Sequence, residues 1–125
     1  VKRGLPLPIA TVKNVRSMIG INNLTDLIIA ASTNPKATNQ TFLASDGTDK
    51  STPALVRLIA KSLNRQTRIF PFPISILRLL AAVFGKSSAI DKLTGSLSVD
   101  ISHTTKTLNW HPPFSIESEI AKAVK

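Results

Sequence analysis

The sequence contains no cysteine and no tyrosine, and only two histidines among its 125 residues. Without cysteine, the chain cannot form a disulfide, act through a thiolate, or bind zinc or an iron–sulfur cluster through sulfur. Two histidines are too few for a metal site made of histidine alone, and no tyrosine is available as a general base. These absences exclude several large classes of enzyme and metalloprotein.

The sequence also lacks the short motifs that mark common active sites. It has five glycines, and none of them belongs to a glycine-rich loop that binds the phosphates of a dinucleotide or of ATP. The G-x-S-x-G turn of a serine hydrolase is missing as well. Serine, histidine and aspartate side chains are present, but nothing in their spacing places them together. The chain by itself therefore lacks the parts of an enzyme.

Long apolar runs are also missing. A membrane span requires roughly 18 apolar residues. The apolar stretches here are shorter, because they are interrupted by the charged residues Arg57, Lys61 and Arg78. The N-terminal Val-Lys-Arg-Gly has no apolar segment of the kind that a signal peptide needs. We therefore expect a cytoplasmic protein with no membrane as partner. Because Val1 lies within what the sequence pattern indicates is a secondary-structure element, we expect the chain to be part of a longer protein.

Positive charge is in excess, since 16 Lys and Arg residues against 7 Asp and Glu give a formal charge of +9. Such a balance suggests nucleic acid or an acidic partner. The basic residues are nevertheless spread along the chain, and no RNA-binding aromatic pattern or helix-turn-helix spacing accompanies them. Arg57, Lys61 and Arg65 form the solvated face of an expected helix. A stand-alone basic module that binds nucleic acid or an acidic partner is thus kept as the alternative hypothesis.

Apolar spacing predicts helices that alternate with short strands, which is typical of an α/β or α+β fold. Helices are expected over residues 22–34, 52–65, 74–84, 102–108 and 115–124, with a loop or short helix at 86–94. Strands are expected at 16–21, 41–44, 68–72 and 97–101. No internal repeat or flexible linker divides the chain, so residues 1–125 are expected to form a single domain.

Several other residues have expected structural roles. Thr52 is predicted to cap the helix that follows it, and Trp110 is predicted to pack in the core at the end of a helix. Asp46 lies in a turn, where we expect its carboxylate to accept hydrogen bonds from local backbone amides. His103 is expected at the surface, and His111 is expected to have a structural role in a proline-rich turn. None of these residues is assigned to a site.

Arg16 differs from the other basic residues because it opens an apolar segment. Its side chain either points to solvent or is held against another group by the sheet. A guanidinium held at the edge of a strand binds an anion through two parallel hydrogen bonds, and a diphosphate is the obvious ligand. Chemistry alone leaves both alternatives open.

Six motifs follow one another in an order that resembles a known family. They read G-x-P-L-P, R-S-M-I-G-I-N-N-L-x-D, N-x-x-F-L-x-S-D-G, a Ser-Thr-Pro helix, L-T-G-S-L-x-V-D-I-S and L-N-W-x-P, at Gly4–Pro8, Arg16–Asp26, Asn39–Gly47, Ser51–Leu63, Leu93–Ser102 and Leu108–Pro112. In this order they resemble the C-terminal part of an extended short-chain dehydrogenase/reductase, of the NAD-dependent epimerase/dehydratase family. The nearest branch is the UDP-glucose 4-epimerase-like group that acts on nucleotide sugars.

The resemblance implies that the dinucleotide-binding loop and a Tyr-x-x-x-Lys pair lie in an N-terminal Rossmann half outside this chain. That half would bind NAD and would be a partner of this chain, which alone would neither hold NAD productively nor catalyse. In the whole enzyme, NAD would take a hydride from the sugar ring and return it to the opposite face while this portion holds the UDP-sugar. The expected whole is a homodimeric 4-epimerase of polysaccharide precursor synthesis.

The resemblance also assigns substrate-binding residues. The family's diphosphate-binding arginine falls on Arg16, and the extended segment whose backbone contacts the nucleotide base falls on Leu5, Pro6 and Leu7. A second phosphate-binding arginine usually stands in an Arg-x-Gly-Asp context. Here Lys92 is the candidate, offset by one residue and without a bidentate fork. No catalytic, cofactor-binding or metal-binding residue is expected within this chain.

Two departures from the family's pattern concern the same segment. Ser17 stands where the family commonly has aspartate, and residues 20–23 read Gly-Ile-Asn-Asn in place of His-Val-x-Asp. These differences indicate a divergent branch. They leave open which sugar is bound, and whether the outcome is epimerisation, dehydration or reduction.

Overall fold

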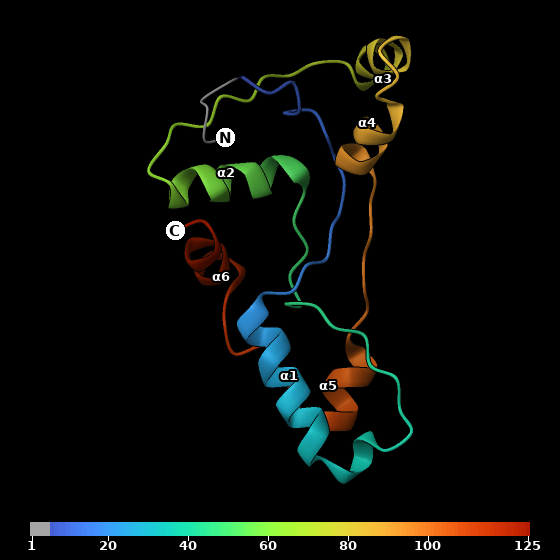
Figure 1. The fold of residues 1–125 in the computed structure, drawn as a ribbon, viewed down its shortest axis with the longest axis vertical. Helices are drawn as coiled ribbons and strands as arrows, with labels where there is room; N and C mark the ends of the chain where they lie inside the picture. The colour runs from blue at the N-terminus through green and yellow to red at the C-terminus, as the bar shows by residue number, and fades with distance from the viewer. Residues whose placement is uncertain (1–5) are drawn as a thin grey trace. The chain divides into compact units, whose positions relative to one another are not determined.

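The computed structural model describes residues 6–125, which form two compact units. The first unit comprises residues 6–16, 50–97 and 124, and the second comprises 17–49, 98–123 and 125. The first contains α2 (Thr52–Ser62), α3 (Ile74–Val83) and α4 (Ser87–Thr94), as Figure 1 shows. The second contains α1 (Ile21–Thr33), the 3-10 helix η1 (Pro35–Ala37), α5 (Ser102–Leu108) and α6 (Ile116–Ala123). The single domain expected over residues 1–125 stays a prediction.

The expected helices are confirmed, with small differences at their ends. Ser51 Oγ accepts a hydrogen bond from the backbone N–H of Ala54 at 3.3 Å, so Ser51 is the N-cap of α2 and the assignment to Thr52 is wrong. After α3 the chain turns at Gly85, whose φ of +68° suits a residue without a side chain. The segment expected as a loop or short helix forms α4.

Regular strands, by contrast, are absent from residues 6–125, and the strands expected at 16–21, 41–44, 68–72 and 97–101 are wrong. Extended backbone stands in their place, with isolated bridges that pair Leu7 with Ile69, Arg16 with Lys50, and Arg16 with Leu97. A strand is defined by a ladder of partners, and single bridges do not build one. A helical structure with isolated bridges fits a part of an α/β fold.

The core of the second unit lies between α1 and α5, which run side by side in Figure 1. Leu27, Leu108 and Trp110 are buried together, with Ala30, Ala31, Ala37, Phe42 and Ala44 partly buried around them. The indole N–H of Trp110 donates to Oδ2 of Asp26 on α1 at 2.7 Å, which satisfies its one polar group. The structural role predicted for Trp110 is confirmed.

Both histidines lie at the surface of the second unit, which confirms the prediction for His103. His103, on α5, stacks on Phe42 with ring centroids 5.4 Å apart. His111 is exposed in the turn that follows α5. Neither histidine is placed where it could serve as a buried general base.

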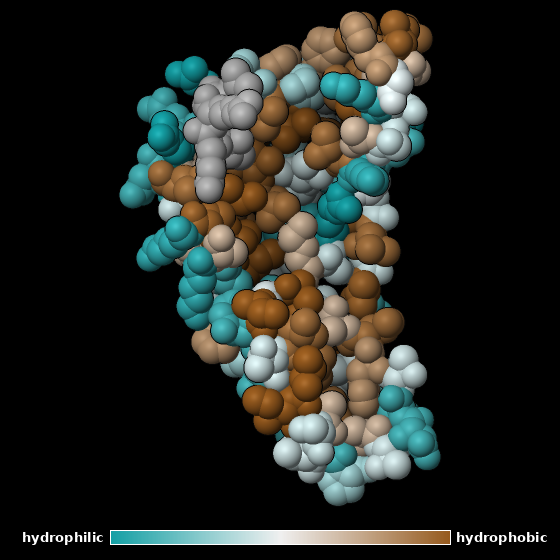
Figure 2. Space-filling model, in the orientation of Figure 1, coloured by the Kyte–Doolittle hydropathy of each residue, from teal (hydrophilic) through white to brown (hydrophobic). Residues whose placement is uncertain are grey.

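Apolar side chains remain exposed in each unit. In the first unit, α3 packs against α4, yet Val83 and the adjacent Phe84 are each 73% exposed. In the second, α1 exposes Ile21, Ile28 and Ile29. Figure 2 shows hydrophobic surface in the regions of α3 and α1. No helix within residues 6–125 combines the length and the apolar character that crossing a membrane requires.

Candidate functional site

Arg16 lies where three backbone segments of the first unit meet. Its N–H donates to the carbonyl of Lys50, and its own carbonyl accepts from the Lys50 N–H, both at 3.0 Å. On the other side, the N–H of Leu97 donates to the carbonyl of Val15 at 2.8 Å. These bonds fix the backbone from two sides, so the half-buried Arg16 side chain leaves from a defined point.

The Arg16 side chain is directed at the C-terminal end of α4. Its guanidinium donates a hydrogen bond to the backbone carbonyl of Lys92, in the last turn of that helix. The final carbonyls of a helix have no partner within it, and a cation there complements the helix dipole. A guanidinium has five N–H donors, of which this bond uses one. The structure thus brings the Arg16 guanidinium to the backbone of Lys92, the other basic residue that the resemblance proposes for phosphate binding.

Lys50 is a third cation at this place, and the sequence reasoning missed it. In an antiparallel bridge, two residues that exchange both backbone hydrogen bonds place their side chains on the same face. Lys50 and Arg16 form such a pair. No local signal distinguishes Lys50, because only the bridge to a residue 34 positions earlier gives it this neighbour. Arg16 and its backbone neighbours Lys50 and Lys92 are all basic residues, which is the chemistry that an anion requires.

The segment predicted to contact a base is only partly described. Leu5 lies outside the described residues, and Pro6 is exposed. The N–H of Leu7 donates to the carbonyl of residue 68 at 2.8 Å, and its carbonyl accepts from the N–H groups of residues 70 and 9, each at 3.0 Å. A carbonyl oxygen has two lone pairs, so the backbone of Leu7 is fully engaged. A contact from Leu7 to a ligand would have to come from its side chain.

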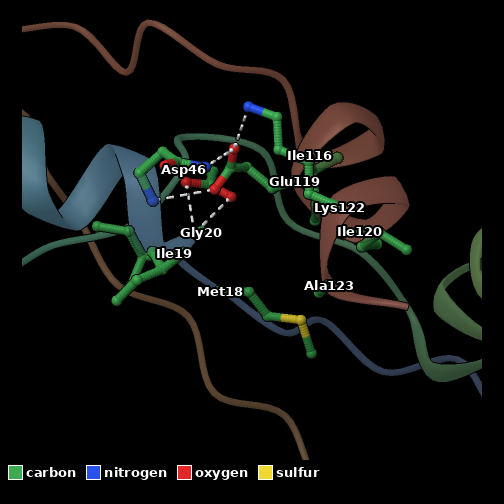
Figure 3. A pocket seen from close by; sticks show the side chains of 11 residues that line it. Met18, Ile19, Gly20, Asp46, Ile116, Glu119, Ile120, Lys122 and Ala123 are labelled. Carbon is green, nitrogen blue, oxygen red and sulfur yellow. Dashed lines mark hydrogen bonds and ion pairs between the residues drawn. The ribbon is translucent and has the colours of Figure 1, made fainter. Parts of the chain in front are cut away.

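A pocket of about 320 Å³ lies in the second unit, between the start of α1 and α6 (Figure 3). Most of its wall is apolar and comes from Met18, Ile19, Ile21, Ile116, Ile120 and Ala123. Polar groups at the pocket come from Gly20, Asn22, Asp46, Glu119 and Lys122. Figure 3 shows the two carboxylates directed at the beginning of α1. No local pattern in the sequence predicts this pocket.

Glu119 is a buried carboxylate at this pocket. Its Oε1 accepts from Nδ2 of Asn22 at 2.8 Å, and its Oε2 accepts from the Asn22 N–H at 3.1 Å. The bond from the Asn22 side chain is the main reason that the pKa of Glu119 lies below its usual range, with Lys122, at 3.7 Å, as a weaker cause. Glu119 is therefore ionised at neutral pH and is occupied with holding the start of α1, which does not suit a general acid.

Asp46 is buried in the same region, and its expected local bonding is wrong. Its two oxygens accept from the N–H of Gly20 at 3.0 and 3.1 Å, and Oδ1 also accepts from Nδ2 of Asn23 at 2.6 Å. Gly20 is 26 residues away in the sequence. The local bond of the turn comes instead from Ser45 Oγ, which accepts from the N–H of Gly47. The N-terminus of α1 attracts Asp46 because its amides lack helical partners and carry the positive end of the helix dipole.

Neither place contains the donor set of a metal centre. Among residues 6–125, no group of three or more His, Asp or Glu side chains is arranged to hold a metal ion. The Arg16 site offers cations for an anion, and the pocket in the second unit offers apolar walls with carboxylates that are already hydrogen-bonded. Of the two, the Arg16 site has the chemistry to bind a charged ligand.

Comparison with curated proteins finds a clear relative. Over 118 residues, this chain is 48% identical to a UDP-glucose 4-epimerase from Vibrio cholerae. The chain resembles part of a UDP-glucose 4-epimerase. The alignment covers 94% of this chain but 36% of the epimerase, so the chain spans about a third of the length of this relative. The resemblance to the epimerase branch predicted from the six motifs is confirmed.

Comparison with protein families and with solved structures finds no further relative of this chain. No protein-family description matches the chain, and no solved structure matches it. The relation to the epimerase therefore rests on the sequence match alone. The arrangement of Arg16 and Lys92 is independent of that match.

Proposed function

We propose that this chain is the UDP-sugar-binding portion of an NAD-dependent nucleotide-sugar epimerase, and that it forms the C-terminal part of the complete enzyme. The observation that carries the proposal is the 48% identity to a UDP-glucose 4-epimerase across 94% of the chain. Because the chain spans about a third of that relative, the catalytic activity would belong to the longer protein. The substrate would be a UDP-sugar, and the reaction would be inversion at the sugar's C4.

In this proposal, Arg16 neutralises the diphosphate of the UDP-sugar and Lys92 assists it. Three observations support this role. The backbone of Arg16 is fixed by bonds to Lys50, its guanidinium is already held at the end of α4, and Lys50 adds charge on the same face. A guanidinium that is held in place loses less conformational entropy when it binds an anion. The segment of Leu5, Pro6 and Leu7 would contact the nucleotide base, with Leu7 doing so through its side chain.

The residues of this chain do not fit NAD. The chain has no tyrosine and no glycine-rich phosphate loop, and the pocket at the start of α1 presents the carboxylates of Asp46 and Glu119, which repel a dinucleotide's diphosphate. NAD would therefore be held by a Rossmann half outside this chain. Within residues 6–125 we assign binding and orientation of the substrate, and no step of hydride transfer. A homodimer of the complete enzyme and a cytoplasmic location belong to the same proposal.

The alternative, a basic module for nucleic acid or an acidic partner, is less well supported. Arg57 and Lys61 are exposed on α2, and Arg65 is exposed beyond its end. Such spacing is typical of a solvated helix face. The identity to an epimerase extends over nearly the whole chain, including these residues' helix, and favours the enzyme hypothesis.

Arg16→Ala in the complete protein that carries this chain tests the proposal. We expect KM for the UDP-sugar to rise by roughly tenfold to a hundredfold, because a charge-assisted contact to the diphosphate is lost. The measurement is steady-state epimerase kinetics with UDP-glucose and UDP-N-acetylglucosamine. Arg57→Ala, at an exposed arginine on α2, is the matched control and should leave KM unchanged.

Two results would contradict the proposal at different levels. Unchanged KM and kcat in Arg16→Ala would remove Arg16 from the site. A complete protein that neither binds UDP nor epimerises any UDP-sugar would refute the proposed function itself. If that protein instead binds RNA or DNA with an affinity that falls steeply as salt is added, the result would favour the alternative of a nucleic-acid-binding module.

A further inference from the structure

Asn14 is a buried polar residue in the first unit, two positions before Arg16, and 4% of its surface is exposed. Its Nδ2 group lies within hydrogen-bond distance of Thr52 Oγ1 at 2.9 Å, the carbonyl of Gly95 at 2.9 Å and the carbonyl of Leu93 at 3.3 Å. Its Oδ1 accepts from the N–H of Thr52 at 2.8 Å. An amide side chain buried this deeply is stable only because all its polar atoms have partners.

These bonds join three segments that surround Arg16. Thr52 begins α2, Leu93 belongs to the last turn of α4, and Gly95 follows that helix directly. The hydroxyl of Thr52 also donates to the carbonyl of Leu93 at 2.7 Å. Asn14 and Thr52 therefore bond to each other and, together, to the end of α4. We call these two residues the Asn14–Thr52 pair.

This pair joins the two segments that carry the proposed phosphate-binding residues. Arg16 follows Asn14 on the same extended segment, and Lys92 immediately precedes Leu93. The hydrogen bond from the Arg16 guanidinium to the Lys92 carbonyl crosses between the segments that the pair holds together. If the pair is lost, the end of α4 is held less firmly to residues 14–16, and the backbone positions of Arg16 and Lys92 are less firmly fixed relative to each other.

We propose that Asn14 and Thr52 are positioning residues of the diphosphate site, which set the spacing between Arg16 and Lys92. The inference rests on the proposed function and deepens it. One phosphate can be bound by a single cation whatever the spacing, but a diphosphate that uses both cations requires them at a matched distance. Loss of the pair therefore weakens the binding of UDP more than the binding of UMP.

Thr52→Val in the complete protein is the direct test, because it removes the hydroxyl and keeps the size of the side chain. We expect Kd for UDP, measured by isothermal titration calorimetry, to rise roughly tenfold, and Kd for UMP to change about twofold or less. KM for the UDP-sugar should rise with the Kd for UDP, while kcat stays within about twofold. Thr52→Ser keeps the hydroxyl and should restore the UDP-to-UMP ratio.

Thr104→Val is the matched control in the second unit. Thr104 is 1% exposed, and its hydroxyl donates to the carbonyl of Leu43 at 2.7 Å, so the substitution removes a similar buried bond. It should lower the unfolding temperature without changing the UDP-to-UMP ratio. Asn14→Asp is a second variant of the pair, which keeps the acceptor for the N–H of Thr52 and loses the donors to α4. If Thr52→Val does not fold, the UDP-to-UMP ratio of Kd values measured for Asn14→Asp tests the positioning role instead.

The outcomes separate the inference from the proposed function. Equal losses for UDP and UMP in Thr52→Val, or the same loss of ratio in Thr104→Val, would overturn the positioning role while the proposed function stands. A wild-type protein that does not bind UDP, or an Arg16→Ala variant that binds it unchanged, would overturn the proposed UDP site and the inference with it.

Discussion

Single polar residues in this protein bond to backbone groups far along the chain and so decide its local geometry. The start of α1 is held by two carboxylates, Asp46 and Glu119, which come from separate segments. Asn14 plays the corresponding part beside the Arg16 site. In each case, a buried polar atom bonds to a backbone group that would otherwise lack a partner. These residues are therefore sensitive points for substitution.

Glu119→Gln should make the free energy of unfolding less dependent on pH in the acidic range. A carboxylate whose pKa is lower in the folded state stabilises the fold above its unfolded pKa, and this contribution is lost as the pH falls through the folded value. We expect the variant to be less stable than the wild type at pH 7, and the difference to shrink below a pH of about 4.3. Urea unfolding at a series of pH values measures this. A difference that grows on acidification would contradict the lowered pKa.

Gly20→Ala should destabilise the second unit, because a Cβ at this position would lie 2.3 Å from Cγ of Glu119. Either the Glu119 side chain moves and loses its bonds to Asn22, or the start of α1 shifts. We expect the free energy of unfolding to fall by about 1–3 kcal/mol. A double-mutant cycle with Glu119→Ala checks the cause, since removal of Cγ should make Gly20→Ala less costly. Additive effects would locate the strain elsewhere.

At the scale of the element, the helices depend on local signals and the extended segments depend on remote ones. α2 begins with a serine cap followed by proline near its first position, and a chain turn at Gly85 follows α3. The extended residues near Arg16 have no such signals, and their conformation is held by Lys50 on one side and Leu97 on the other.

Ser51→Ala tests the cap of α2. The substitution removes the oxygen that accepts from the N–H of Ala54, and we expect a loss of about 1 kcal/mol in the free energy of unfolding. Ser51→Thr keeps a hydroxyl and should recover most of that loss. Chemical denaturation measures both variants. An unchanged stability in Ser51→Ala would mean that the cap bond contributes nothing.

At the scale of the whole molecule, each unit leaves apolar surface exposed. Leu79 on α3 is 66% exposed, Val83 and Phe84 are 73% exposed, and Ile21 at the start of α1 is 71% exposed. Helices that are apolar on nearly all sides are usually covered by other parts of a protein. Our proposal that this chain belongs to a longer enzyme accounts for the exposed surface without giving each patch a function of its own.

The isolated chain should therefore self-associate. We expect an apparent mass in sedimentation that rises with protein concentration, because exposed apolar surface of this kind promotes contact between molecules. The double variant Leu79→Lys/Val83→Lys should reduce the association, and Arg57→Ala should not affect it. A monomer at every concentration would show that these side chains do not drive association.

Much of the fold and part of the site could be predicted from the sequence. Spacing, caps and breakers determine helices within a few residues, so the helices and the buried Trp110 were confirmed. The order of six motifs was enough to predict the relation to an epimerase. The anion-binding role of Arg16 was proposed from its place at the start of an apolar segment, and it stays a prediction. These features depend on neighbours in the sequence or on an ordered set of short motifs.

Two features depend on the tertiary structure alone. One is the absence of regular strands from residues 6–125, and the other is the choice of partners for the buried polar residues. A short apolar segment becomes a strand only when other segments pair along it, and here isolated bridges are all that residues 6–125 provide. Asn22 and Glu119 are 97 positions apart, and Asn14 and Gly95 are 81 apart. Bonds over such separations leave no local pattern in the sequence, because they depend on how distant segments meet in the folded chain.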